Sequence, residues 1–311
     1  MDDPREDFLV NIALSKSYIH YEPSLVLLFG GEINIKDPEP TSIREMLVEY
    51  CADEGNGLNN SIRLAEHYKD WYENQHYDNL LKFEEDLSQL ATLVVIILES
   101  AGTIAELGAF CVNKKIKNNL VIAMSEKHFN KKSFITLGPL KQLDEDAILA
   151  YSWKRKKLKS TVPDELPILV QDIEEIIKKK KTQTIDLKNI GHLSYLAHEL
   201  IIQFKALTSR EIKYYFSCLE IETSDKEIKK ILYLLGLLEL VKSRKKGNKL
   251  FFLAKCKSSR IAFSGHDPKY RIDEAELHMS VMRYYANTDK EDIRHKIIFQ
   301  EYKLKEEESK E

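Results

Sequence analysis

The chain has 311 residues, of which 43% are hydrophobic and 31% are charged, so it can bury a sizeable core and still present a charged surface. The mean hydropathy is −0.38, and no run of about 18 apolar residues occurs, which excludes an ordinary membrane-spanning helix. The four cysteines lie far apart without a Cys-x-x-Cys pair, which argues against a zinc module or a disulfide framework. The acidic first residues are unlike a signal peptide, and we expect a cytoplasmic protein without membrane association.

Charge is divided unevenly along the chain. Residues 1–150 contain 25 acidic and 14 basic side chains, whereas residues 151–311 contain 25 acidic and 33 basic side chains. This asymmetry is compatible with two domains, one of which contacts a polyanion. It is equally compatible with two solvated surfaces that happen to differ in sign.

The first half alternates between short apolar runs and amphipathic segments. The apolar runs predict strands at residues 25–29, 61–64, 92–98, 120–124 and 147–151. The periodic segments predict helices at residues 42–50, 77–90, 104–113 and 163–180. The run at 92–98 is apolar on both faces, as expected of a central strand covered by helices. Such alternation predicts an α/β fold, a Rossmann-like doubly wound parallel sheet, over residues 1–180.

The second half is basic and mainly helical. We expect a polar linker at residues 182–184, followed by helices at 190–205, 208–218 and 224–237. A hairpin around Lys246-Gly247-Asn248 follows these helices. Three helices and a hairpin predict a winged-helix domain over residues 185–256. Residues 257–311 are expected to form a helical C-terminal extension, with a disordered charged tail from residue 303.

The hairpin carries five basic residues that suit contacts with nucleic-acid phosphates. They are Lys242, Arg244, Lys245, Lys246 and Lys249. The alternative is a solvated turn, in which lysine is a common residue.

The segment from Glu99 to Gly108 carries the chemistry that we expect of the first domain. Glu99 ends the predicted central strand, at the edge where open parallel sheets bind ligands. Gly102 allows a tight turn, Thr103 begins the predicted helix, and Glu106 lies in its first turn. Two carboxylates at such a site are typical of glycosidic bond cleavage, with Glu106 as nucleophile or base. Alternatively, Thr103 and Glu106 form a capping box.

Six further residues are candidates for substrate contacts because they lie at predicted strand ends and helix starts. They are Gly30, Gly31, Ser100, Gly102, Thr103 and Ser133. The two glycines could equally form an ordinary tight turn, and Ser133 could be a helix cap. The sequence contains neither a dinucleotide fingerprint nor a P-loop, and His192 and His198 lack metal-binding spacing. We therefore expect no metal and no cofactor.

Residues 99–110 resemble the signature of the nucleoside deoxyribosyltransferase-like family, and in particular of the effector proteins encoded beside bacterial retrons. Residues 132–139 and the strand that ends at Phe29-Gly30-Gly31 are similar to further parts of those effectors. The resemblance implies that Glu106 is the catalytic carboxylate and that Glu99 is the acidic residue at the strand end. It also places the family's second-strand carboxylate at Glu66, where the surrounding residues match poorly.

The resemblance further implies a toxin of an anti-phage defence system. Such effectors associate with a retron reverse transcriptase and its RNA–DNA hybrid product (msDNA), and these partners hold them inactive. Related effectors cleave the N-glycosidic bond of NAD or of nucleotides, and members often form homo-oligomers. The alternative from another class is a non-enzymatic, nucleotide-sensing regulator that binds DNA through its winged helix.

Overall fold

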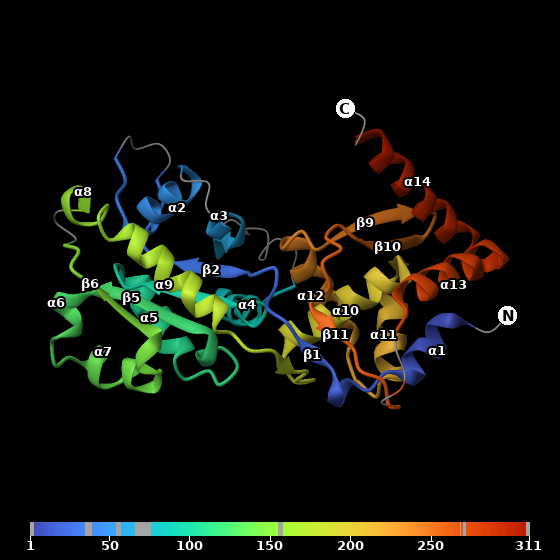
Figure 1. The fold of residues 1–311 in the computed structure, drawn as a ribbon, viewed down its shortest axis with the longest axis horizontal. Helices are drawn as coiled ribbons and strands as arrows, with labels where there is room; N and C mark the ends of the chain where they lie inside the picture. Colours follow the sequence, from blue (N-terminus) through green and yellow to red (C-terminus); the bar gives the residue numbers. More distant parts are fainter. Residues whose placement is uncertain are drawn as a thin grey trace. The chain divides into compact units, whose positions relative to one another are not determined.

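The structure is a computed structural model that describes residues 3–34, 39–53, 57–65, 76–154, 158–267, 269 and 272–308. It contains two compact units (Figure 1). Tyr21–Lys181 form one of them, which we call the α/β unit. Met1–His20 and Thr182–Glu311 together form the other, which we call the helical unit. The first 20 residues thus belong with the C-terminal part and not with the first domain, which was predicted to begin at residue 1.

A five-stranded parallel sheet forms the centre of the α/β unit. Its strands are β2 (Val26–Phe29), β3 (Ile62–Arg63), β4 (Leu93–Ile97), β5 (Leu120–Ser125) and β6 (Ile148–Tyr151). Their order is β3-β2-β4-β5-β6, and every adjacent pair is parallel. All five residues of β4 are buried, which confirms the prediction of a central strand at 92–98.

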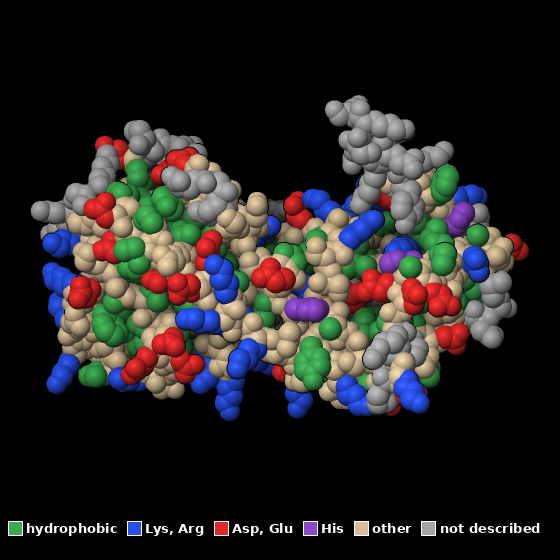
Figure 2. Space-filling view, in the orientation of Figure 1, with side chains coloured by type: hydrophobic (Ala, Val, Ile, Leu, Met, Phe, Trp, Pro, Cys, Tyr) green, Lys and Arg blue, Asp and Glu red, His purple; other side chains and the backbone are tan. Residues whose placement is uncertain are grey.

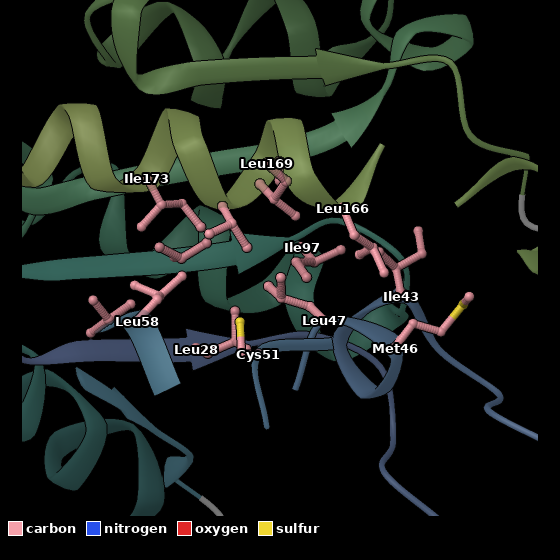
Figure 3. Packing of buried hydrophobic residues seen from close by; sticks show 14 of the residues in the cluster. Leu28, Ile43, Met46, Leu47, Cys51, Leu58, Ile97, Leu166, Leu169 and Ile173 are labelled. Atoms are coloured by element: carbon pink, nitrogen blue, oxygen red, sulfur yellow. The ribbon is translucent and has the colours of Figure 1, made fainter. Parts of the chain in front are cut away.

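Helices cover both faces of this sheet, and the α/β unit has eight α-helices among its described residues. They are α2 (Ile43–Asp53), α3 (Gly57–Ser61), α4 (Leu80–Ser88), α5 (Ala101–Phe110), α6 (Glu126–Phe129), α7 (Phe134–Leu137), α8 (Leu158–Thr161) and α9 (Leu166–Lys178). Figure 3 shows Leu47 of α2 and Leu169 of α9 packed over Leu28 and Ile97 of the strands. On the opposite face, the Phe110 ring of α5 lies edge-on to Phe29, with centroids 5.5 Å apart.

The helical unit contains two small antiparallel sheets. The first has the order β11-β1-β7, and the second has the order β8-β10-β9. Its strands are β1 (Tyr18–Ile19), β7 (Gln183–Thr184), β8 (Ala206–Leu207), β9 (Val241–Lys246), β10 (Lys249–Ala254) and β11 (Ile261–Ala262). Its helices are α1 (Pro4–Asn11), α10 (Ile190–Phe204), α11 (Ser209–Cys218), α12 (Asp225–Leu237), α13 (Glu274–Ala286) and α14 (Asp292–Glu308).

The caps predicted for α11 and α12 are confirmed. Thr208 with Glu211, and Ser224 with Glu227, both form complete capping boxes. Each pair satisfies backbone N–H groups that the first helical turn leaves without partners.

Two expectations about the ends of elements are wrong. The expected linker at residues 182–184 contains β7, which pairs with β1 near the N-terminus. The expected disordered tail is helical as far as Glu308, since it continues α14; residues 309–311 lie outside the described residues. By contrast, the hairpin predicted around Lys246-Gly247-Asn248 is confirmed, because β9 ends at Lys246 and β10 begins at Lys249. The positive φ of 57° at Gly247 favours glycine there.

A buried arginine, Arg5, ties the N-terminal helix of the helical unit to its last helices. Its guanidinium pairs with Asp3 at 2.6 Å and with Glu291 at 3.6 Å, and it donates to the Tyr285 hydroxyl at 3.2 Å. Arg5 is only 4% exposed. Buried charge is stable only when it is paired and hydrogen-bonded, and these contacts provide both.

The acidic first half and the basic second half of the sequence do not give one acidic and one basic surface on the face shown in Figure 2. Acidic and basic side chains are interspersed there over both units. Among the described residues, no helix combines the length and the apolar character that crossing a membrane requires.

Candidate active site and nucleic-acid interface

Glu99 follows β4 at the carboxyl edge of the sheet, and its carboxylate binds backbone groups from two neighbouring segments. Oε1 accepts hydrogen bonds from Gly31 N at 2.7 Å and from Arg44 N at 3.1 Å. Oε2 accepts from Ile43 N at 2.7 Å. Ile43 and Arg44 begin α2, and the N–H groups of a first helical turn have no acceptor within the helix. The Glu99 carboxylate therefore supplies that acceptor. Glu99 therefore fixes the end of β2 and the start of α2 to the central strand.

The close approach of the start of α2, together with Glu99, explains why two glycines follow β2. A Cβ atom at Gly31 would lie 2.6 Å from Ser42 Cβ and 3.0 Å from Glu99 Cδ. A Cβ atom at Gly30 would lie 2.5 Å from Arg44 Cβ. From the sequence we expected these glycines either to contact the substrate or to form an ordinary tight turn. In the structure, the Gly31 backbone N–H meets Glu99 instead.

Helix α5 begins earlier than expected, which changes the position of Glu106. The N-cap is Ser100, and the capping box joins Ser100 to Thr103, not Thr103 to Glu106. Thr103 Oγ1 donates to Ser100 O at 2.9 Å and accepts from Ser100 N at 3.1 Å. The alternative capping role of Glu106 is therefore wrong, and so is its placement in the first turn. Glu106 lies in the second turn and is half-buried.

Two glycines of the same helix have open space around them. A Cβ atom at Gly102 would meet only Ser100 Oγ, at 3.7 Å. No atom would lie within 4 Å of a Cβ atom at Gly108. Gly108 is therefore not required for close packing of α5 against the sheet.

A cavity of about 1010 Å³ opens at the carboxyl ends of β4, β5 and β6. Three of the predicted site residues line it, namely Glu99, Ser100 and Ser133. The other predicted residues of the α/β unit are not part of its lining as described; they are Gly30, Gly31, Gly102, Thr103 and Glu106. Glu66 lies outside the described residues. Glu99 and Ser133 thus line one cavity. Glu106 lies in the second turn of α5, outside the described lining.

Basic side chains of this cavity were missed in the sequence. Lys127, His128 and Lys131 follow β5, and Lys154 follows β6. Their signal was the position after two predicted strands, where ligands of parallel sheets bind. The short helix α6, which carries Lys127 and His128, was not predicted.

Polar contacts inside the cavity wall fix its shape. Ser125 Oγ donates to Trp153 O at 3.0 Å, and the Trp153 ring lies 4.8 Å from that of Tyr151. Tyr151 donates to Asp172 Oδ2 at 2.7 Å, and burial together with Asp172 raises the pKa of this phenol. Ser133 is the N-cap of α7 and accepts from Thr136 N at 3.3 Å. Its role as a cap is confirmed, and its hydroxyl still lies in the cavity wall.

The basic residues of the hairpin do not share one environment. Arg244 Nε lies 2.6 Å from Glu301 Oε1 of α14, and Lys242 also pairs with Glu301. Lys245, Lys246 and Lys249 are exposed near the turn, where Lys246 and Lys249 lie opposite each other. In the part of the chain that the structure describes, no group of three or more His, Cys, Asp or Glu side chains is placed to hold a metal ion.

Sequence comparison gives these observations a context. Residues 40–243, about two thirds of the chain, match the family described as STM3845 retron effector protein. The chain belongs to this retron effector family.

Two proteins of Escherichia coli are also similar to this retron effector. The "Retron Ec73 putative ribosyltransferase/DNA-binding protein" is 44% identical over 70 residues, which are 22% of each chain. The protein of the same description from retron Ec86 is 26% identical over 142 residues, 43% of this chain and 46% of that protein. The chain thus spans less than half the length of either curated relative.

Proposed function

We propose that this retron effector is the toxin of an anti-phage system and an N-glycosidase that acts on NAD or a related nucleotide. The observation that carries the proposal is the segment from Glu99 to Glu106 at the carboxyl edge of a parallel sheet, beside a cavity of about 1010 Å³. The similar proteins described as ribosyltransferases support it, because ribosyl transfer breaks a bond at C1′.

In the proposed reaction, Glu106 attacks C1′ of the ribose or activates a water molecule that does so. The bond between C1′ and the base nitrogen breaks, and its electron pair leaves with the base. Water supplies the oxygen that ends on C1′ and the proton that balances the products. The nicotinamide of NAD leaves without protonation, because breaking the bond removes the positive charge of its ring nitrogen.

Glu99 holds the site together in this proposal. Its Oε1 already accepts two backbone hydrogen bonds, whereas Oε2 accepts one. A carboxylate oxygen has two lone pairs, so Oε2 retains the capacity to orient a ribose hydroxyl. Gly30 and Gly31 act by allowing this close approach, while Ser100, Gly102, Thr103 and Ser133 form the turns beside the substrate.

The helical unit supplies the contact with nucleic acid. We infer that this unit contains a winged helix. The element order α10-β8-α11-α12-β9-β10, with β8 paired to β10 and β10 to β9, supports this inference. Basic residues at its hairpin suit phosphate contacts. We infer that the retron reverse transcriptase and its RNA–DNA product bind the effector and restrain it, and that the active species is a cytoplasmic homo-oligomer.

A DNA-binding regulator that senses a nucleotide without cleaving it is the second candidate. The same helix and strand order favours it, as does the description of both similar proteins as DNA-binding. The two candidates differ in whether a carboxylate is needed for toxicity.

Expression of the chain without its retron partners tests the proposal. The wild type should stop growth, and Glu106→Gln, which keeps the size but removes the charge, should abolish the effect at equal protein level. Glu145→Gln, which changes an exposed glutamate of the same unit outside the cavity lining, is the matched control and should remain toxic. A toxic Glu106→Gln protein would contradict the assignment of Glu106.

A further inference from the structure

The two faces of the basic hairpin differ in what they contact. Side chains alternate between faces along a strand, so Lys242 and Arg244 share one face of β9, while Lys245 lies on the other. In the neighbouring strand β10, Leu253 lies opposite Lys242, and Phe251 lies opposite Arg244. Both partners are buried, at 5% and 1% exposure, and opposite residues of an antiparallel pair share a face. Lys242 and Arg244 therefore lie on the inward face of the hairpin.

Helix α14 places one carboxylate against this inward face. Glu301 accepts from Arg244 Nε at 2.6 Å through Oε1 and pairs with Lys242 through Oε2. Figure 1 shows α14 beside β9. The Glu301 side chain is 11% exposed, compared with 29% for Lys242 and 50% for Arg244. Burial alone would raise the pKa of Glu301, but the hydrogen bonds from Lys242 and Arg244 outweigh it and lower this pKa.

We propose that Glu301 is an internal competitor for nucleic-acid phosphate, so that α14 limits the affinity of the hairpin for a double-stranded nucleic acid. The inference rests on the proposed nucleic-acid contact of the helical unit and deepens it. A carboxylate between a guanidinium and an ammonium group occupies the position that a phosphate oxygen pair would take.

The competition divides the five basic residues into two sets. Lys245, Lys246 and Lys249 are exposed around the turn and make the first phosphate contacts. Lys242 and Arg244 join them only when Glu301 withdraws. The affinity for nucleic acid therefore depends on whether α14 lies against β9, as well as on the charge of the hairpin.

The test is the binding of the full chain to a short DNA duplex and to an RNA–DNA hybrid of the same length, by fluorescence anisotropy over a series of salt concentrations. Glu301→Gln should bind about threefold or more tightly at low salt. Its plot of log affinity against log salt should be steeper by about 1 to 2, because each added phosphate contact contributes about −0.9 to the slope.

Two further variants separate competition from net charge and from misfolding. Glu239→Gln removes a carboxylate that pairs with Lys255 at 2.8 Å on the same unit, so it makes the same change in net charge. It should leave the slope unchanged. Glu301→Asp keeps the charge but withdraws the carboxylate by one methylene, and should fall between the wild type and Glu301→Gln. It also serves as the test if Glu301→Gln fails to fold.

Different failures have different meanings. If the wild type binds and both Glu301 variants share its affinity and slope, the competition is overturned while the nucleic-acid contact stands. If Glu239→Gln shifts binding as much as Glu301→Gln does, net charge is the cause and the competition is again overturned. If no protein binds either probe at low salt, the proposed nucleic-acid contact fails, and the inference fails with it.

Discussion

A charged side chain in each unit, Glu99 in one and Arg5 in the other, is satisfied in a different way. In the α/β unit, Glu99 is held by three backbone N–H groups at the edge of the sheet, beside the cavity. In the helical unit, Arg5 is held by acidic side chains and by the Tyr285 hydroxyl between helices. The first arrangement positions a site and the second positions whole helices. We therefore expect substitutions around Glu99 to disturb the site, and substitution of Arg5 to destabilise the helical unit.

Removing Arg5 gives the largest expected effect and tests whether the units unfold separately. Arg5→Met should destabilise the helical unit by about 3 to 5 kcal/mol, because it leaves buried acidic groups without their partner. Both tryptophans, Trp71 and Trp153, belong to the α/β unit. Circular dichroism should therefore show an early loss of helix in urea, while the tryptophan fluorescence transition stays in place. Transitions that shift together would show that the units unfold as one.

Acid should also act first on the helical unit, through His198. Its Nε2 lies 3.0 Å from Cys256 O, and burial lowers the pKa of the imidazole to about 4. In the unfolded chain the pKa is about 6.5, so between these values only the unfolded state binds the proton, and stability falls as the pH falls. The loss from pH 7 to 4 should approach roughly 3 kcal/mol. Urea titrations over this range should show it, and His198→Gln should flatten that part of the pH dependence.

A smaller effect on stability is expected at Gly31, which lies close to Ser42 and Glu99. Gly31→Ala should destabilise the α/β unit by about 1 to 3 kcal/mol, because the added methyl group overlaps Ser42 and Glu99. Gly108→Ala is the matched control, with no atom within 4 Å of its Cβ, and should be neutral or stabilising by about 0.5 to 1 kcal/mol. Tryptophan fluorescence reports both. Equal effects of the two substitutions would contradict the structural role of Glu99.

Local sequence patterns predicted the strands and several helix caps. They could not predict contacts between residues that lie far apart in the sequence. The five strands and the caps at Thr208 and Ser224 follow from short runs and fixed spacings. The start of α5 was misplaced because two capping patterns overlap, and the one from Ser100 to Thr103 forms. The pairing of β1 with β7 and β11, and of Glu301 with Arg244, joins residues far apart in sequence. No spacing rule indicates such contacts in a single sequence.

Base release most directly tests the central claim that Glu106 cleaves an N-glycosidic bond. The wild type and Glu106→Gln would each be incubated with NAD and a panel of nucleotides and nucleosides, alone and with the retron reverse transcriptase and its RNA–DNA product. Chromatography would measure the free base. We predict release from NAD or a nucleotide by the wild type, and a rate at least about 10²-fold lower for Glu106→Gln. Equal rates for the two proteins, or no release by the wild type under either condition, would contradict the account.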